Sequence, residues 1–133
     1  RTAKCCMKTV TREWIEKAEG DYRTAEREIL AEPPNYDAAA FHAQQCAEKY
    51  LKARMIEAGI TFPKTHDLTA LLMPVPPSDP EWETLRPKLD ALTSLGIEVR
   101  YPGVSADAED AQEALETARI VRNLVRGSLG LHG

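Results

Sequence analysis

An excess of positive charge and a long hydrophobic run are both missing from the sequence, and each absence excludes a class of protein. Its 133 residues carry 17 lysines and arginines against 21 aspartates and glutamates, a formal net charge of −4. Such a chain has no general positive field for nucleic acid, so any RNA or nucleotide must bind at a local patch. No apolar stretch approaches the roughly 20 residues that cross a bilayer, so we expect no contact with a membrane.

Cysteine and histidine are also scarce, with three residues of each. An odd number of cysteines, two of them adjacent at Cys5 and Cys6, provides no disulfide framework and is typical of the reducing cytoplasm. The three histidines are scattered and match no spacing of metal ligands. We therefore expect a cytoplasmic protein with neither a metal nor another cofactor.

Sustained alternation of polar and apolar residues, which indicates a β-strand, is missing too. Apolar residues instead recur at spacings of three and four, the pattern of amphipathic helices. This pattern predicts long helices over residues 11–30, 36–59, 80–95 and 107–129, and Thr65 begins a short helix between the second and third. The expected fold is all-α, an antiparallel up-and-down four-helix bundle with an additional short helix.

Proline and glycine mark the expected ends of these helices. The prolines of residues 32–35 end the first helix, and Gly59 ends the second. Residues 73–80 form a stiff connection whose last two residues, Asp79 and Pro80, are typical of a helix start. Pro87 is expected to bend or shorten the third helix.

The length of the chain suits one domain with a single core, and no internal repeat is present. We expect this domain to occupy residues 11–129. Residues 1–10 are then an N-terminal tail without regular structure, and residues 130–133 a C-terminal tail.

The second helix carries an unusual line of polar residues. At roughly 100° per residue, four of them stay within one narrow arc of the helix: His42, Gln45, Lys49 and Lys52. The opposite side is small and apolar, so a neighbouring helix can approach closely. The polar line is either a solvated face or the rim of a cleft or dimer interface. Neutral amides at Gln44 and Gln45, where a surface helix more often has charge, favour the second interpretation.

The same stretch resembles the HEPN domain family (higher eukaryotes and prokaryotes nucleotide-binding). The matching residues form two blocks, which are Phe41, Ala43, Gln44, Gln45, Glu48, Lys49, Leu51 and Lys52, followed by Lys64, His66, Asp67 and Leu68. A third block, residues 100–102 followed by an acidic stretch and residues 110–115, resembles a further segment of the family. The resemblance implies a helical up-and-down bundle that is commonly a homodimer.

The resemblance also implies two alternative functions. Many HEPN proteins resemble metal-independent RNases, in which an arginine is followed four to six residues later by a histidine. Arg100 stands in that region, but no histidine follows it in "YPGVSADAED". The one pair with this spacing, Arg126 and His132, lies at the end of the last helix, and we interpret it as coincidence. We therefore assign no catalytic residue.

Our first hypothesis is a non-catalytic or weakly catalytic partner of a small nucleotidyltransferase, in a pair that resembles a toxin–antitoxin system. Such a protein would form a homodimer and bind a nucleotide, an RNA or its partner through a polar cleft. The alternative is an RNase with a rearranged site around Arg100, His42 and His66.

The expected ligand-binding residues combine the polar line with the two other blocks. They are His42, Gln45, Lys49, Lys52, His66, Asp67, Arg100 and Tyr101. Several cations on a chain of net charge −4 favour an anionic ligand, so we expect His42, Lys49, His66 and Arg100 to converge on one cleft before the last helix. Tyr101 offers a ring that can stack on a base. His66 and Asp67 have a structural alternative, in which they cap or pack the short helix.

Overall fold

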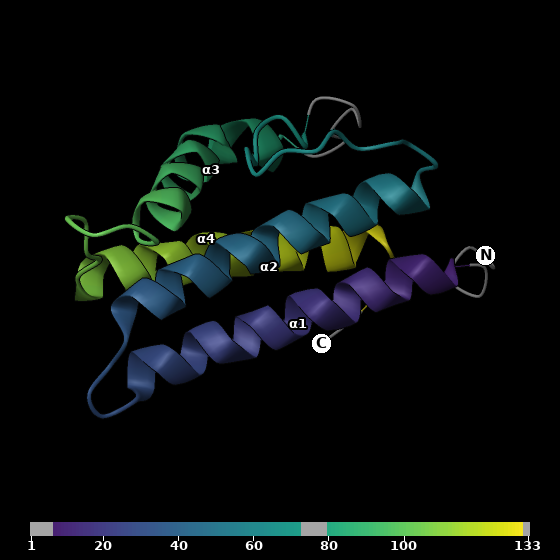
Figure 1. Ribbon diagram of the computed structural model, residues 1–133. Coiled ribbons are helices and arrows are strands. Elements are labelled where there is room, and N and C mark those ends of the chain that lie inside the picture. The colour runs from purple at the N-terminus through teal and green to yellow at the C-terminus, as the bar shows by residue number, and fades with distance from the viewer. Residues whose placement is uncertain (1–6, 73–79, 132–133) are drawn as a thin grey trace.

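Four long helices make up most of the chain that the structure describes. The computed structural model describes residues 7–72 and 80–131, in which α1 spans Thr9–Leu30, α2 Tyr36–Glu57, α3 Glu81–Glu98 and α4 Ala108–Ser128. Successive helices run in opposite directions, and α1, α2 and α4 lie side by side while α3 is inclined across them (Figure 1). That part of the chain contains no strand. The predicted all-α, up-and-down four-helix fold is confirmed.

Helix α2 is the central element, because it packs against each of the other three helices. Its small residues Ala43, Cys46 and Ala47 are fully buried, as are Tyr50 and Leu51. Small side chains let the neighbouring helices approach closely, and the aromatic and branched residues fill the remaining space. The apolar packing face that the sequence predicted for this helix is confirmed.

The loop between α3 and α4 is anchored on the N-terminus of α2. Asp37, in the first turn of α2, accepts a hydrogen bond of 2.7 Å from the backbone N–H of Ala106. Asp107 then caps α4 together with Asp110 in a reciprocal capping box. This end of the bundle therefore brings residues 99–107 beside the first turns of α2 (Figure 1).

Helix α3 is longer than its sequence predicted. The loop was expected to begin at Gly96, but the helix continues to Glu98 and contains Pro87 without being shortened by it. Gly96 is buried, and a Cβ atom at this position would lie 2.7 Å from the side chain of Gln44. Glycine is therefore required where α3 crosses α2, and it does not end the helix.

The expected short helix is replaced by turns. Backbone bonds link Leu71 to Leu68 and Leu72 to Thr69, and the N–H of Leu68 bonds to the hydroxyl of Thr93 on α3. All three leucines of the segment are buried, as the pattern predicted. The connection of residues 73–79, with the predicted helix start at Asp79, lies outside the described residues.

The ordered bundle begins earlier than expected at the N-terminus. Helix α1 starts at Thr9, and Met7 packs into the core. At the other end, the N–H of Leu131 bonds to the carbonyl of Arg126 at 2.8 Å and closes the last turn of α4. His132, the second member of the coincidental pair with Arg126, lies outside the described residues.

Leu89→Ala should destabilise the protein strongly, because Leu89 on α3 has no exposed surface and its truncation leaves a cavity. We expect the free energy of unfolding to fall by about 2–5 kcal/mol in urea titrations. Val10→Ala, at a half-exposed position of α1, is the control and should cost less than about 0.5 kcal/mol. Equal effects of the two substitutions would contradict the packing of α3.

Candidate functional site

A surface groove lies where the loop before α4 meets the start of α2. It has a volume of about 420 Å³ and is lined by Asn35, Asp37, Ala38, Phe41, His42, Val99 and Arg100. We call it the Arg100 groove. His42 and Arg100, which the sequence analysis singled out from distant parts of the chain, are thus on the same groove.

Arg100 is the positive group of this groove. Its guanidinium carbon lies 5.7 Å from the centre of the Phe41 ring, a cation–π distance. The ion pairs found in residues 7–72 and 80–131 do not include Arg100, which is exposed. The start of α2 adds the partial positive charge of a helix N-terminus. The carboxylate of Asp37 also lines the groove and offsets part of this positive charge, so the place that favours an anion is beside Arg100.

Two residues of the polar line share a carboxylate of α1. Nδ1 of His42 lies 2.8 Å from one oxygen of Asp21, and Nζ of Lys49 lies 2.6 Å from the other. We call these three residues the Asp21 cluster. The side chain of Asp21 is only 11% exposed, so the two contacts are partly shielded from water. The positive charge of Lys49 is thereby neutralised inside the protein.

A second carboxylate, Glu48, organises the other polar residues of α2. Its oxygens accept hydrogen bonds from Gln44 at 3.1 Å, Lys52 at 2.8 Å and Nδ1 of His66 at 2.9 Å. We call these four residues the Glu48 cluster. The ammonium group of Lys52 also lies 5.0 Å from the ring centre of Phe62. Because Glu48 is buried, the three donors are what makes its charge tolerable there.

The same donors determine the ionisation of Glu48. Burial alone would raise the pKa of this carboxyl, but the hydrogen bonds to its charged form outweigh burial and hold the pKa below its ordinary value. The charged form is therefore stabilised in the folded protein more than in the unfolded chain.

A third carboxylate, Glu19 on α1, connects α2 and α4. Arg122 donates two hydrogen bonds to it, from Nε at 2.6 Å and from Nη2 at 3.0 Å, and the buried Tyr50 donates a further one. Arg126 donates to the Tyr50 hydroxyl at 3.4 Å. Burial and the bond to Glu19 raise the pKa of Tyr50, so its hydroxyl stays protonated. This network joins three helices and lies apart from the residues of the Arg100 groove.

The remaining predicted residues have local roles in the structure. Gln45 donates a hydrogen bond of 2.9 Å to the side chain of Gln44. Asp67 accepts bonds from the N–H and hydroxyl of Thr69 and so caps a turn. Tyr101 is 60% exposed and follows Arg100 in the loop, which leaves its ring available to a ligand.

The expected convergence of four residues on one cleft is therefore only partly found. His42 and Arg100 share the groove, whereas Lys49 does not line it and is linked to His42 only through Asp21. His66 belongs to the Glu48 cluster and does not line the groove. Lys49 and Lys52 each form an ion pair with a carboxylate of the protein, Asp21 for Lys49 and Glu48 for Lys52.

The sequence did not predict the two carboxylates that organise these clusters: Glu48 entered only as a residue that resembles the family, and Asp21 not at all. Glu48 could have been found, since Gln44, Glu48 and Lys52 follow one another at a spacing of four on the helix. Asp21 gave no such signal, because its partners lie on another helix. The groove residues Asn35 and Asp37 were missed for the same reason.

Other kinds of site find little support in the described residues. Within residues 7–72 and 80–131, no three metal-binding side chains gather at one place. Cys46 is buried, and burial raises the pKa of its thiol, which makes it a poor nucleophile. None of the helices in this part of the chain is both long and apolar enough to cross a membrane.

Comparison with known proteins establishes the family. The family model described as HEPN domain matches residues 11–128, so the chain belongs to the HEPN domain family. A protein of Methanocaldococcus jannaschii named "Putative toxin MJ1304" is 28% identical over 133 residues, with 87% of this chain and 86% of that protein covered.

Two solved structures are similar in both fold and sequence. One is TT1696 from Thermus thermophilus, with a TM-score of 0.74, 25% identity and coverage of 88% of this chain and 96% of that chain. The other is ST0689, described as an archaeal HEPN homologue, with a TM-score of 0.71, 28% identity and coverage of 90% and 97%.

Glu48→Gln should make the protein less sensitive to acid. Because the pKa of Glu48 is lowered on folding, its contribution is fully present above the ordinary value of 4.5 and is lost as the pH falls through the lowered value. We expect the variant to lose about 1–3 kcal/mol at pH 7 and to show a smaller further loss in acid than the wild type, in urea titrations from pH 7 to 3.

Glu116→Gln is the matched control, since Glu116 forms an exposed ion pair with Arg119 on the surface of α4. This substitution should change stability by less than about 1 kcal/mol at any of these pH values. Parallel stability–pH curves for the wild type and Glu48→Gln would contradict the role of the Glu48 cluster.

Proposed function

We propose that this HEPN protein is the ligand-binding, non-catalytic member of a toxin–antitoxin-like pair, and that the Arg100 groove is where it binds a nucleotide or RNA. The observation that carries the proposal is the placement of Arg100 and His42 on one groove. A phosphate group would accept a forked pair of hydrogen bonds from the guanidinium of Arg100. Tyr101 is the next residue after Arg100, and its exposed ring would stack on the base of the same ligand.

The proposed biological role rests on the relatives. A protein with 28% identity over most of both chains carries the name "Putative toxin MJ1304", which supports a place for this chain in a toxin–antitoxin-like pair. The residue blocks around Gln44 and His66 resemble HEPN proteins that are encoded beside a small nucleotidyltransferase. We therefore propose such an enzyme as the partner, and an adjacent nucleotidyltransferase gene would support it directly.

Arg100→Ala should weaken the binding of ATP and of a short single-stranded RNA about tenfold or more, because it removes the groove's positive charge. Calorimetric titration of the wild type and the variant measures the effect. Arg12→Ala removes the same charge from an exposed position at the far end of α1 and is the control. Equal binding by the wild type and Arg100→Ala would refute the assignment of the groove.

A second candidate, metal-independent cleavage of RNA, is favoured by one observation. Asp21 holds Nδ1 of His42, so Nε2 of the neutral ring is a base that can take the proton of a 2′-hydroxyl. The 2′-oxygen would then attack phosphorus as the bond to the 5′-oxygen breaks, with Arg100 stabilising the charge of the phosphate. The products are a 2′,3′-cyclic phosphate and a 5′-hydroxyl, whose oxygen takes its proton from water. Gels of the same RNA samples decide between the candidates. Our proposal expects intact RNA, whereas cleavage that both His42→Ala and Arg100→Ala abolish would establish the enzyme.

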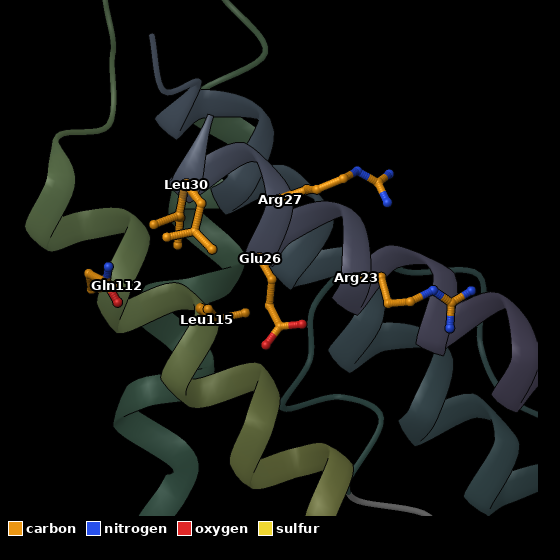
Figure 2. Close-up of a pocket in the computed structure, with 7 residues that line it drawn as sticks. Arg23, Glu26, Arg27, Leu30, Gln112 and Leu115 are labelled. Atoms are coloured by element: carbon orange, nitrogen blue, oxygen red, sulfur yellow. The ribbon is translucent and has the colours of Figure 1, made fainter. Parts of the chain in front are cut away.

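The protein is also proposed to form a homodimer, through a groove between α1 and α4. This α1–α4 groove has a volume of about 490 Å³ and is lined by Arg23, Glu26, Arg27, Ile29, Leu30, Gln112 and Leu115. Figure 2 shows Leu30 and Leu115 on the two facing helices, with Arg23 and Arg27 directed away from α4. Leu30 is 80% exposed, so a second copy that covers it would bury apolar area at little cost.

Leu30→Glu should convert the dimer into a monomer, because it introduces a charge at the centre of the proposed contact. Light scattering at tens of micromolar protein should show twice the mass of the chain for the wild type and a single mass for the variant. Val10→Glu, at another exposed apolar position of α1, should remain dimeric. A monomeric wild type would exclude the dimer.

A further inference from the structure

We propose that Asp21 is a positioning residue, which fixes His42 so that its Nε2 accepts a hydrogen bond from the ligand of the Arg100 groove. The inference rests on the function proposed for that groove and goes further, because it specifies what the ligand must contain. Nε2 of His42 is a hydrogen-bond acceptor beside the cation Arg100. Such a pair selects an anion that also carries a hydroxyl or amino group as a donor.

The first step of the argument is the contact itself. Nδ1 of His42 lies 2.8 Å from Oδ1 of Asp21, well within hydrogen-bond distance. An ionised carboxylate has no proton to give, so Nδ1 must be the donor. Whenever the imidazole is neutral, its single proton is therefore on Nδ1, and Nε2 keeps its lone pair.

The second step is the orientation of the carboxylate. The other oxygen of Asp21 accepts a bond of 2.6 Å from the ammonium group of Lys49. This second contact restricts rotation of the carboxylate and so holds the other oxygen toward His42. His42 and Lys49 lie two turns apart on α2, so a single helix presents both donors to one residue of α1.

The third step is the orientation of the ring. The rings of His42 and Phe41 meet edge to face, with their centres 5.3 Å apart and an interplanar angle of 81°. Phe41 also carries the guanidinium of Arg100 at 5.7 Å. The imidazole of His42 and the guanidinium of Arg100, which would both contact a ligand, thus lie against the same ring of Phe41. Asp21 in addition holds His42 at Nδ1.

The Glu48 cluster provides an internal reference for this arrangement. Nδ1 of His66 lies 2.9 Å from a carboxylate oxygen, almost the same contact as in His42. His66 does not line the Arg100 groove, and 55% of its side chain is exposed. Both histidines should therefore show the same tautomer, but only His42 should affect the ligand of the groove.

Nitrogen-15 NMR of the imidazole rings, without ligand, tests the position of the proton. We expect both neutral rings of the wild type to carry it on Nδ1. In Asp21→Asn the amide can donate to Nδ1, so His42 should shift toward the Nε2-protonated tautomer while His66 stays unchanged. Glu16→Gln removes a charge from an exposed position of α1 and should alter neither ring.

Two results would overturn the positioning role. One is a neutral His42 protonated on Nε2 in the wild type, a measurement that needs no variant to fold. The other is an unchanged His42 signature in Asp21→Asn.

Titration with ATP and with sulfate tests the ligand's chemistry. Sulfate is an anion without a hydrogen-bond donor. The change in its affinity therefore measures how much more strongly the groove attracts any anion once the negative charge of Asp21 is removed. We expect Asp21→Asn to lower the affinity for ATP relative to sulfate about three- to tenfold, the effect of one hydrogen bond. An unchanged ratio would refute the required donor. Failure of the wild type to bind ATP or RNA at all would refute the proposed function, while the NMR result would still decide the role of Asp21.

Discussion

Burial of α2 on three sides is the constraint on which the rest of the structure depends. A helix in this position can keep a polar side chain only where a partner is supplied, either by a neighbouring element or by the next turn of the helix itself. Its buried Gln44 and Glu48 satisfy this requirement through His66, which the connection after α2 supplies. The close crossing of α3 at Gly96 leaves Gln44 little freedom to move. Tertiary contacts, together with bonds within α2 itself, therefore fix the polar residues of this helix.

The pairing of charges along α2 follows from this burial. Asp21 and Glu48 each take one lysine and one histidine, so the polar line of α2 carries little uncompensated charge. Among the ion pairs of the described chain, Arg100 takes no part. Its position follows from the length of α3, which ends two residues before it, and from the bond that ties Ala106 to Asp37.

The two histidines illustrate how similar contacts lead to different roles. Each uses Nδ1 to bind a carboxylate. His42 lies on α2 and binds Asp21 of α1, whereas His66 lies in the connection after α2 and binds Glu48 of α2. His42 consequently faces a groove that also contains a guanidinium, whereas His66 ties a connecting segment to the bundle. A histidine's chemistry here depends on what its second nitrogen faces, and the sequence does not contain that information.

The sequence by itself determined the four helices, the apolar face of α2 and the stops at residues 32–35 and Gly59, since these depend on periodicity and on local backbone preferences. The sequence predicted that the third helix ends before Gly96, which was wrong, because glycine serves equally to end a helix and to let another helix approach. The expectation that His42 and Arg100 lie in one cleft followed from their charge, and both residues line the Arg100 groove.

Only the tertiary structure decided which of the polar residues meet. Asp21 lies on α1 and reaches His42 and Lys49 because α1 and α2 are antiparallel neighbours. The Arg100 groove needs the start of α2 and the end of α3 at one end of the bundle. Spacing along a helix fixes which side chains share a face of that helix, but electrostatic pairing depends on distance in space, which only the packing of the helices sets.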